Sequence, residues 1–274
     1  MTFEKVSATA LDYAPCRYGA SRTTFRGPAK DLRAPYVATL GGTETYGRFV
    51  PEPFADLLER RLGRTVVNFG CVNAGLDVFI ADDVVMQACA EAALTVIQIT
   101  GAQNMSNRFY TVHPRRNDRF LRASNVMQGI WPEIDFTDIH FTRHLLGVLK
   151  AASSDRFAML ERELAEAWVA RMQALVRQLS GRAVLLWMAD RRPGEATDPA
   201  ADAGPLFVTR EMIELLRPHV LDIVEVVAPR PYPELGTEGM VFAPLEFSAA
   251  EALPGPAEHV RAAEILADRL ARHL

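Results

Sequence analysis

The sequence predicts an α/β protein, a three-layer sandwich with a five-stranded parallel sheet covered by helices on both faces. Short runs rich in β-branched residues alternate with longer segments of helical periodicity along the 274 residues. No two of the runs assigned as strands are joined by a tight hairpin turn, which favours parallel strands joined by helical crossovers. The strand runs are almost continuously apolar, as expected when both faces of a sheet are covered.

The pattern fixes the expected place of each strand and helix. Strands are expected at residues 36–40, 65–69, 94–100, 183–188 and 221–227. Helices are expected at residues 53–62, 82–93, 155–179, 209–216 and 256–274. Pro256 suits the first turn of the last helix, where a missing N–H costs no hydrogen bond. Five parallel strands connected in this way fit the flavodoxin-like order 2-1-3-4-5.

The chain is expected to form one domain over residues 35–274, preceded by an irregular arm at residues 1–34. A single α/β domain reaches this length. Some fifty residues at 102–154 exceed what a crossover needs, so we predict an insertion there, with a helical part at 137–150. Residues 191–204 are rich in Asp, Ala, Pro and Gly and are expected to form a surface loop.

Composition and charge exclude several classes of protein. With 49% apolar and 23% charged residues, the chain is an ordinary globular protein rather than a disordered, collagenous or coiled-coil one. The net charge of -4 does not favour a nucleic-acid partner. No stretch reaches 18 uncharged apolar residues and the N-terminus has no leader pattern, so we predict a cytoplasmic protein without a membrane contact.

Neither a metal nor another cofactor is predicted. Cys16, Cys71 and Cys89 have no CxxC spacing and are expected to be buried thiols. His140 and His144 have the spacing of a helical metal pair, but no third ligand accompanies them. The glycine patterns of nucleotide-binding loops follow none of the expected strands.

The loops after the first three strands combine glycines with hydroxyl and amide side chains. They read GGTETYG at residues 41–47, NFGCVNAG at residues 68–75 and GAQN at residues 101–104. In an open parallel sheet, ligands bind at the carboxyl ends of the strands near the point where the strand order reverses. A hydroxyl beside backbone N–H groups and carboxamides suits acyl transfer, in which a nucleophile attacks a carbonyl and donors stabilise the oxyanion.

These motifs resemble those of the SGNH/GDSL hydrolase superfamily. The G-D-S-x-T-x-G block of that family matches residues 41–47, with Thr43 in place of the nucleophilic serine. Gly70 matches the oxyanion glycine, and residues 101–104 resemble the G-x-N-D block, which makes Gln103 and Asn104 candidate oxyanion amides. The D-x-x-H block matches residues 256–259, with Pro256 in place of the acid and His259 as the base.

The resemblance implies an SGNH-like fold and a hydrolase or acyltransferase, since most members of that superfamily are esterases, lipases, carbohydrate deacetylases or acyltransferases. Thr43 would attack, His259 would accept its proton, and the Gly70 N–H with the Gln103 or Asn104 carboxamide would hold the oxyanion. The substrate would be a small ester, either anionic or carbohydrate-linked. A more specific likeness, to a family of alphaproteobacterial proteins, implies no activity.

An arginine-rich segment follows the third loop. It contains Arg108, Arg115, Arg116, Arg119 and Arg122. Because a guanidinium group pairs well with carboxylate, phosphate or sulfate, one interpretation is a clamp that binds an anionic substrate, together with Asn73 of the second loop. The other interpretation is a solvated or subunit-facing surface.

Other interpretations of these residues stay open at this stage. The alternative function is a non-catalytic SGNH-like module that binds an anionic ligand or a protein partner through the arginine-rich insertion. A third is group transfer to or from an anionic donor, with Arg115, Arg116 and Arg119 as the clamp. Thr43 is also a candidate helix N-cap, and His259 a candidate surface residue. The expected partner is a small molecule, and the long insertion is compatible with a homodimer.

Overall fold

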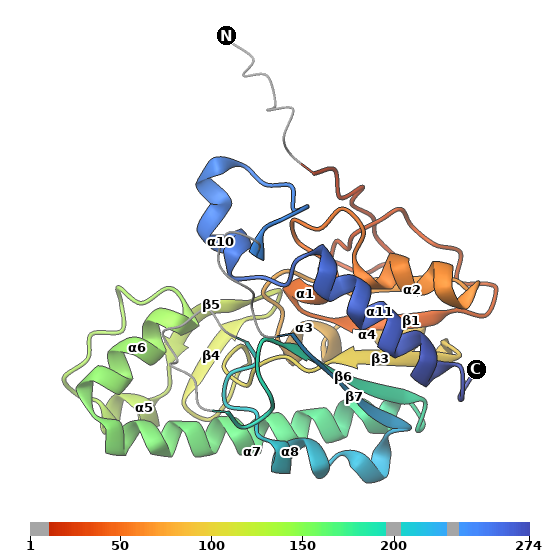
Figure 1. Ribbon diagram of the computed structural model, residues 1–274. Helices are drawn as coiled ribbons and strands as arrows, with labels where there is room; N and C mark the ends of the chain where they lie inside the picture. Colours follow the sequence, from red (N-terminus) through yellow and green to blue (C-terminus); the bar gives the residue numbers. More distant parts are fainter. Residues whose placement is uncertain (1–10, 196–203, 229–235) are drawn as a thin grey trace.

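A computed structural model describes residues 11–195, 204–228 and 236–274, and its centre is a five-stranded parallel sheet (Figure 1). The strands are β1 (Val37–Gly41), β2 (Val66–Gly70), β3 (Leu94–Gln98), β6 (Ala183–Ala189) and β7 (Asp222–Val227), in the order β2-β1-β3-β6-β7. Counted along the chain this is 2-1-3-4-5, so the predicted order is confirmed. Leu40 of β1 lies level with Phe69 of β2 and Ile97 of β3, and the first three strands therefore end at one edge.

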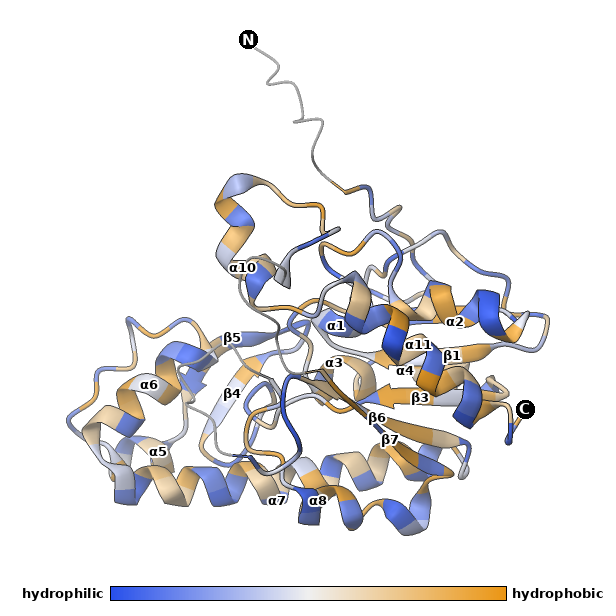
Figure 2. Ribbon diagram, in the orientation of Figure 1, coloured by the Kyte–Doolittle hydropathy of each residue, from blue (hydrophilic) through white to orange (hydrophobic). Residues whose placement is uncertain are grey.

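Helices cover both faces of the sheet. One face carries α2 (Phe54–Leu62) and α11 (Pro256–Leu270), and the other carries α3 (Leu76–Ile80), α4 (Asp83–Glu91), α7 (Ser154–Gln178) and α8 (Arg210–Glu214). Neighbouring strand residues belong to different cores, because side chains alternate across a strand: Val96 packs with α2 and α11, and Ile97 packs with α4 and α7. In Figure 2 the parallel strands are mostly hydrophobic, whereas α2, α7 and α11 contain both hydrophilic (blue) and hydrophobic (orange) residues. The three-layer class is thus confirmed.

All five predicted strands and all five predicted helices are present, with ends that differ by a few residues. The short helices were not predicted. They are α1 (Thr43–Tyr46), α3, α5 (Asn125–Ile130), α10 (Phe247–Glu251) and the 3-10 turns η1 (Arg217–His219) and η2 (Pro244–Glu246). Each has fewer than two turns, which is too short for an apolar stripe to appear in the sequence. Part of the expected surface loop, residues 196–203, lies outside the described ranges.

The segment 102–154 contains an antiparallel hairpin that the sequence analysis did not predict. Strands β4 (Tyr110–His113) and β5 (Arg116–Ala123) pair across a turn at Pro114 and Arg115, with an irregular register. Strand β5 was missed because it mixes buried and exposed residues, several of the exposed ones arginines, instead of forming an apolar run. Helix α6 (Thr142–Ala152) follows and overlaps the predicted helical part.

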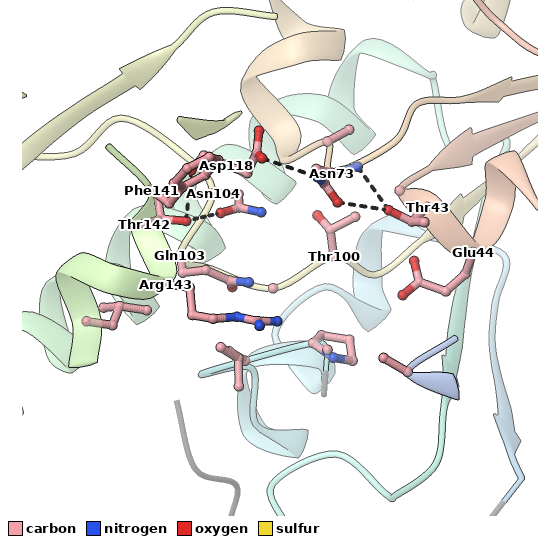
Figure 3. Close-up of a pocket in the computed structure, with 18 of the residues that line it drawn as sticks. Thr43, Glu44, Asn73, Thr100, Gln103, Asn104, Asp118, Phe141, Thr142 and Arg143 are labelled. Carbon is pink, nitrogen blue, oxygen red and sulfur yellow. Dashed lines mark hydrogen bonds between the residues drawn. The ribbon is translucent and has the colours of Figure 1, made fainter. Parts of the chain in front are cut away.

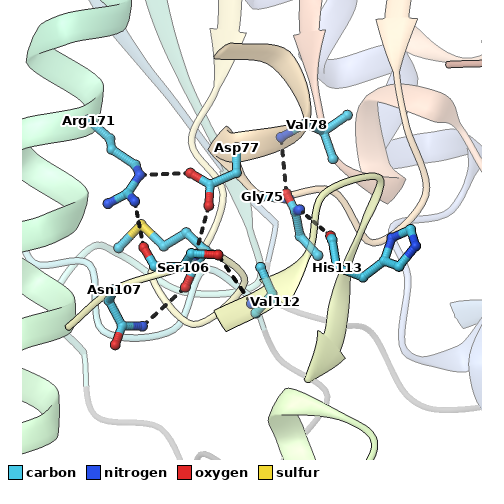
Figure 4. Close-up of polar contacts among 10 residues, drawn as sticks. Gly75, Asp77, Val78, Ser106, Asn107, Val112, His113 and Arg171 are labelled. Atoms are coloured by element: carbon cyan, nitrogen blue, oxygen red, sulfur yellow. Dashed lines mark hydrogen bonds and ion pairs between the residues drawn. The ribbon is translucent and has the colours of Figure 1, made fainter. Parts of the chain in front are cut away.

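Polar contacts fix this segment to the main sandwich (Figure 4). Asp77 of α3 accepts hydrogen bonds from Arg171 of α7 and from the backbone N–H of Ser106, both at 2.7 Å. The Ser106 hydroxyl in turn accepts from the backbone N–H of Val112 in β4, at 3.1 Å. The hairpin is therefore tied to two helices of the sandwich through one short loop.

The described part of the N-terminal arm packs against the end of β2 and the loop after α1. Phe25 lies edge-on to Phe69 of β2 with ring centroids 5.2 Å apart. The guanidinium group of Arg26 is buried and donates to the carbonyl groups of Gly47 and Val50, at 2.7 and 2.9 Å.

Among the helices that the structure describes, none is long and apolar enough to cross a membrane.

Candidate functional site

A cavity of about 900 Å³ lies at the carboxyl edge of the sheet, where the three glycine-rich loops meet. Its walls also include one residue of β5, residues along α6 from Thr142 to Ala151, and the segment before α11. The polar residues that line it are Thr43, Glu44, Arg48, Asn73, Gln98, Thr100, Gln103, Asn104, Asp118, Thr142, Arg143 and His144. The position agrees with the rule that ligands bind where the strand order reverses.

Thr43 lines this cavity as the first residue of α1. The helix begins without a side-chain cap, because Gly42 occupies the capping position, so the Thr43 hydroxyl does not serve as the N-cap. Its Oγ1 accepts a hydrogen bond from the backbone N–H of Asn73 at 2.9 Å and lies 3.3 Å from Asn73 Oδ1, to which it donates. The hydroxyl is thus held on both sides by one residue of the second loop (Figure 3).

Asn73 connects Thr43 to the hairpin. Its backbone is left-handed, with φ of 57°, a conformation that asparagine adopts more readily than most residues. Its Nδ2 donates to Asp118 Oδ2 of β5 at 3.2 Å. The carboxylate of Asp118 therefore faces the cavity at the end of a chain of hydrogen bonds that begins at the Thr43 hydroxyl (Figure 3).

Glu44 is held at the opposite side of Thr43 by a buried glutamine. Gln98 Oε1 accepts from the backbone N–H of Gly42 at 3.0 Å and from the Thr45 hydroxyl at 2.6 Å, which fixes the orientation of its amide. Its Nε2 then donates to Glu44 Oε2 at 2.7 Å. The sequence analysis missed Glu44 and Gln98 as site residues, although Glu44 directly follows Thr43 in the first loop.

The third loop supplies amides, and Thr100, the residue before it, supplies a hydroxyl without a hydrogen-bond partner. Asn104 Oδ1 accepts from the Thr142 hydroxyl at 2.7 Å. The Oε1 atom of Gln103 and the Oγ1 atom of Thr100 are buried and have no hydrogen-bond partner. Thr100 lines the cavity but is only 7% exposed, and its hydroxyl oxygen is buried behind the cavity wall.

Gly70 does not offer its N–H group to the cavity. That amide donates to Asn68 Oδ1 at 2.8 Å, and Gly70 is not among the described residues that line the cavity. A Cβ atom at this position would lie 2.2 Å from the Tyr46 nitrogen, so glycine is required here for the close approach of β2 and α1. This geometry gives no support to the predicted oxyanion role of Gly70.

No contact in the described part of the chain joins His259 to Thr43. It is 1% exposed in the first turn of α11, its ring stacks on Phe54, and its Nδ1 accepts from the Phe54 backbone N–H at 3.0 Å. Burial, together with the charge of Arg26, lowers the pKa of His259 from 6.5 to about 3. The imidazole is therefore a neutral core residue in this geometry, not the surface residue that was the other interpretation.

None of the five arginines of the arginine-rich segment lines the cavity in the described structure, including Arg108, Arg115, Arg116 and Arg119, the four predicted to bind substrate. Arg108 forms an ion pair with Glu163 at 2.7 Å, and Arg115 and Arg116 are exposed at the hairpin turn. Arg119 lies against the ring of Phe141, which is itself part of the cavity wall. Two other arginines, Arg48 and Arg143, line the cavity instead.

Sequence patterns gave little sign of these two arginines. Arg48 follows the first loop and pairs with Glu246 at 3.0 Å, and Arg143 extends from the start of α6 toward the cavity (Figure 3). Both are single basic residues in segments without a motif. No group of three His, Cys, Asp or Glu side chains suited to a metal ion occurs among the residues that the structure describes.

A family model described as "Domain of unknown function (DUF6473)" matches residues 1–274, and the chain belongs to this family. No curated protein matches the chain. Among solved structures, it is similar to a carbohydrate esterase family 2 enzyme with a carbohydrate binding domain from Corynascus thermopiles (Myceliophthora fergusii). The identity is 12% and the TM-score 0.47, over 92% of this chain and 70% of that one.

Two further structures are similar over most of their length. One is a protein described as lipolytic and of the G-D-S-L family from Desulfitobacterium hafniense, at 12% identity and a TM-score of 0.44, covering 86% of this chain and 100% of that one. The other is a lipase from a goat rumen metagenome, at 10% identity and a TM-score of 0.46, covering 86% and 97%. At such low sequence identity, the similarity to these structures concerns the fold alone and not the activity. The SGNH-hydrolase-like fold implied by the motifs agrees with the observed strand order.

Proposed function

We propose that this member of the DUF6473 family binds a small, hydroxyl-rich molecule of the carbohydrate class in the cavity beside Thr43, without a Thr–His catalytic pair. The observation that carries the proposal is the environment of the Thr43 hydroxyl. Its two hydrogen bonds are both with Asn73, and no imidazole or carboxylate in the described chain is bonded to it. An amide is not a base at neutral pH, so nothing bonded to the hydroxyl activates it for attack.

The chemistry of the walls supports a neutral polar ligand. Glu44 and Asp118 balance the two guanidinium groups of Arg48 and Arg143, so the described walls carry no formal net charge when His144 is neutral. Each carboxylate accepts several hydrogen bonds, and each carboxamide both accepts and donates them, which suits ligands with many hydroxyl groups. A cavity of about 900 Å³ has the size of a small-molecule site.

The binding proposal is tested by thermal denaturation and titration calorimetry with neutral mono- and disaccharides. A ligand present at 100 times its dissociation constant should stabilise the protein by about 2.7 kcal/mol. Glu44→Gln and Asp118→Asn should each weaken binding by about tenfold, because each replaces a charge-assisted hydrogen bond by a neutral one.

Asp138→Asn provides the matched control, since Asp138 is an exposed carboxylate of the same segment that does not line the cavity. This variant should bind like the wild type. Saccharides that leave the melting temperature and the calorimetric signal unchanged would rule out the proposed ligand class.

A second candidate is acyl transfer by Thr43, the function implied by the resemblance to SGNH hydrolases. The observation that favours it is that Thr43 lines the cavity and its hydroxyl lies beside a backbone N–H donor, that of Asn73, at 2.9 Å. If Thr43 reacts, Thr43→Ala should abolish hydrolysis of a short-chain aryl acetate and lower the melting temperature by only about 2–4 °C. Thr43→Ser should retain or raise the rate, since it removes the methyl group that crowds the oxygen. Hydrolysis that persists in Thr43→Ala would exclude this candidate.

A further inference from the structure

Part of the cavity beside Thr43 has apolar walls. The large side chains there come from segments far apart in the chain: Phe141 before α6, Val148 within α6, and Leu253 before α11. Phe141 is 43% exposed, and the other two are partly exposed, although all three line a concave site. Apolar surface that stays open to water inside a cavity favours the binding of an apolar group that covers it.

Helix α6 has two apolar faces with different surroundings. Leu145 and Leu149 are fully buried in the core, whereas Gly147, Val148 and Ala151 line the cavity. The three cavity residues share one side of the helix, because residues three and four apart in sequence lie on the same face. The wall that the second half of α6 contributes is therefore apolar.

The polar and apolar parts of the cavity follow one another along α6. Thr142, the first residue of the helix, donates to Asn104 of the third loop at 2.7 Å, so the polar loops adjoin this end. Figure 3 shows Thr142 across the cavity from Thr43. Ala151 lies about 13 Å further along the helix axis, at a rise of about 1.5 Å per residue. A ligand that reaches both ends is longer than one sugar ring.

Gly147 leaves open space on the apolar wall. A Cβ atom at this position would have no described atom within 4 Å. In the polar loops, by contrast, a Cβ atom at Gly42 would lie 3.2 Å from the Glu44 carboxylate, and one at Gly101 would lie 2.1 Å from Gln103 Oε1. The cavity of about 900 Å³ is also near the upper end of the range for small-molecule sites, so one hexose does not fill it.

We propose that the ligand of this cavity is an amphiphilic glycoside, a neutral sugar that carries an alkyl group, and that the alkyl group lies along α6 over Gly147 and Val148. This rests on the proposed function, in which the hydroxyl-rich part of the ligand occupies the polar part of the cavity. Gly147, Val148 and Ala151 have no side chain that forms hydrogen bonds. A second sugar ring would therefore lose hydrogen bonds to water along this wall, whereas an alkyl group would not.

The test is titration calorimetry with methyl β-glucoside and hexyl β-glucoside, which have the same sugar and no charge, below the critical micelle concentration. The wild-type protein should bind the hexyl glycoside about thirtyfold more tightly. This is the gain expected if about half of the added methylene groups are buried, at roughly fourfold each. The heat-capacity change on binding should also be more negative for the hexyl glycoside, because it buries more apolar surface.

Gly147→Leu fills the proposed alkyl site without a clash at its Cβ atom. It should abolish the preference for the hexyl glycoside and keep the affinity for methyl β-glucoside within about threefold. The melting temperature should not fall, because leucine favours a helix more than glycine does. Gly129→Leu is the matched control: Gly129 lies in α5, a Cβ atom there also has no described atom within 4 Å, and it does not line the cavity. This variant should keep the wild-type preference.

Each outcome supports or overturns the inference. Equal affinities of the two glycosides for the wild type, or a preference that survives in Gly147→Leu, overturn the alkyl site while the saccharide proposal stands. Loss of both glycosides in Gly147→Leu contradicts the division of the cavity into two parts. If neither glycoside binds, or if 1-hexanol binds as tightly as hexyl β-glucoside, the proposed function fails and the inference fails with it.

Discussion

Thr43 and His259 occupy very different surroundings, although the resemblance placed them in one reaction. Thr43 lies at the cavity and is bonded to Asn73, whereas His259 accepts a hydrogen bond from the backbone of α2 in the core. The first position could be predicted because a glycine-rich loop after the first strand of a parallel sheet ends at the ligand edge. The position of His259 could not be predicted, since the four residues at the start of a helix do not show which face of that helix is buried.

Protonation of His259 should make the protein sensitive to acid. In the folded state its pKa is lowered from 6.5 to about 3, while in the unfolded chain the imidazole binds a proton below about 6.5. The unfolded state therefore binds more protons between these two values, and stability falls as the pH falls through this window. Between pH 7 and pH 5 the loss from this residue amounts to about 2 kcal/mol.

Urea denaturation of His259→Gln at the two pH values measures that contribution. A glutamine side chain can still accept from the Phe54 N–H, but it does not titrate, so the variant should lose about 2 kcal/mol less than the wild type on acidification. His273→Gln changes an exposed histidine near the end of the chain and should behave like the wild type. Equal acid sensitivity of wild type and His259→Gln would show that the buried imidazole does not have this pKa.

At the scale of elements, the β4–β5 hairpin shapes the cavity because it carries Asp118 to Asn73. Its anchor is Asn117, which is fully buried: its Oδ1 accepts from the N–H groups of Gly75 and Val78, at 2.9 and 3.2 Å, and its Nδ2 donates to the His113 carbonyl at 3.0 Å. The same asparagine thus closes the hairpin and caps the start of α3.

Asn117→Ala should destabilise the protein by about 3 kcal/mol, because it leaves two buried N–H groups and one carbonyl without their partner. Hydrogen exchange should become faster in α3 and in both hairpin strands before it does in the parallel sheet. Asn125→Ala, at an exposed position in α5, is the control and should have little effect. Faster exchange spread evenly over the whole chain would contradict a local anchoring role.

The long elements were predictable and the short ones were not, for physical reasons. The strands of the parallel sheet are apolar along their whole length, and α7 repeats its buried residues Phe157, Leu160 and Leu164 at helical spacing. Strand β5 carries arginines on its exposed side, and the one-turn helix α1 depends on Gln98, a residue more than fifty positions away. Such long-range hydrogen bonds leave no local pattern in the sequence.

At the scale of the whole molecule, one sheet separates two cores that share the same strands. Leu266 of α11 belongs to the core with α2, and Leu164 of α7 belongs to the core on the other face; both are fully buried. Because each strand contributes alternate residues to the two cores, loss of packing on one face must disturb the other.

Leu266→Ala and Leu164→Ala should each lower the free energy of unfolding by about 2–5 kcal/mol. All three tryptophans are buried with the α7 core, so tryptophan fluorescence reports on one face, while far-UV circular dichroism reports on all helices. In both variants the two signals should change in a single coincident transition. A fluorescence transition that stays at the wild-type midpoint in Leu266→Ala would indicate two independently stable layers.

The central claim, that the cavity binds a saccharide without an active Thr–His pair, is tested most directly by proton NMR of an acetylated saccharide mixed with the protein. The account predicts that the acetyl methyl signal broadens on binding, keeps its intensity over time and gives no free acetate. Release of acetate at a rate that disappears in Thr43→Ala would contradict the claim, as would an acetyl signal that the protein leaves unchanged.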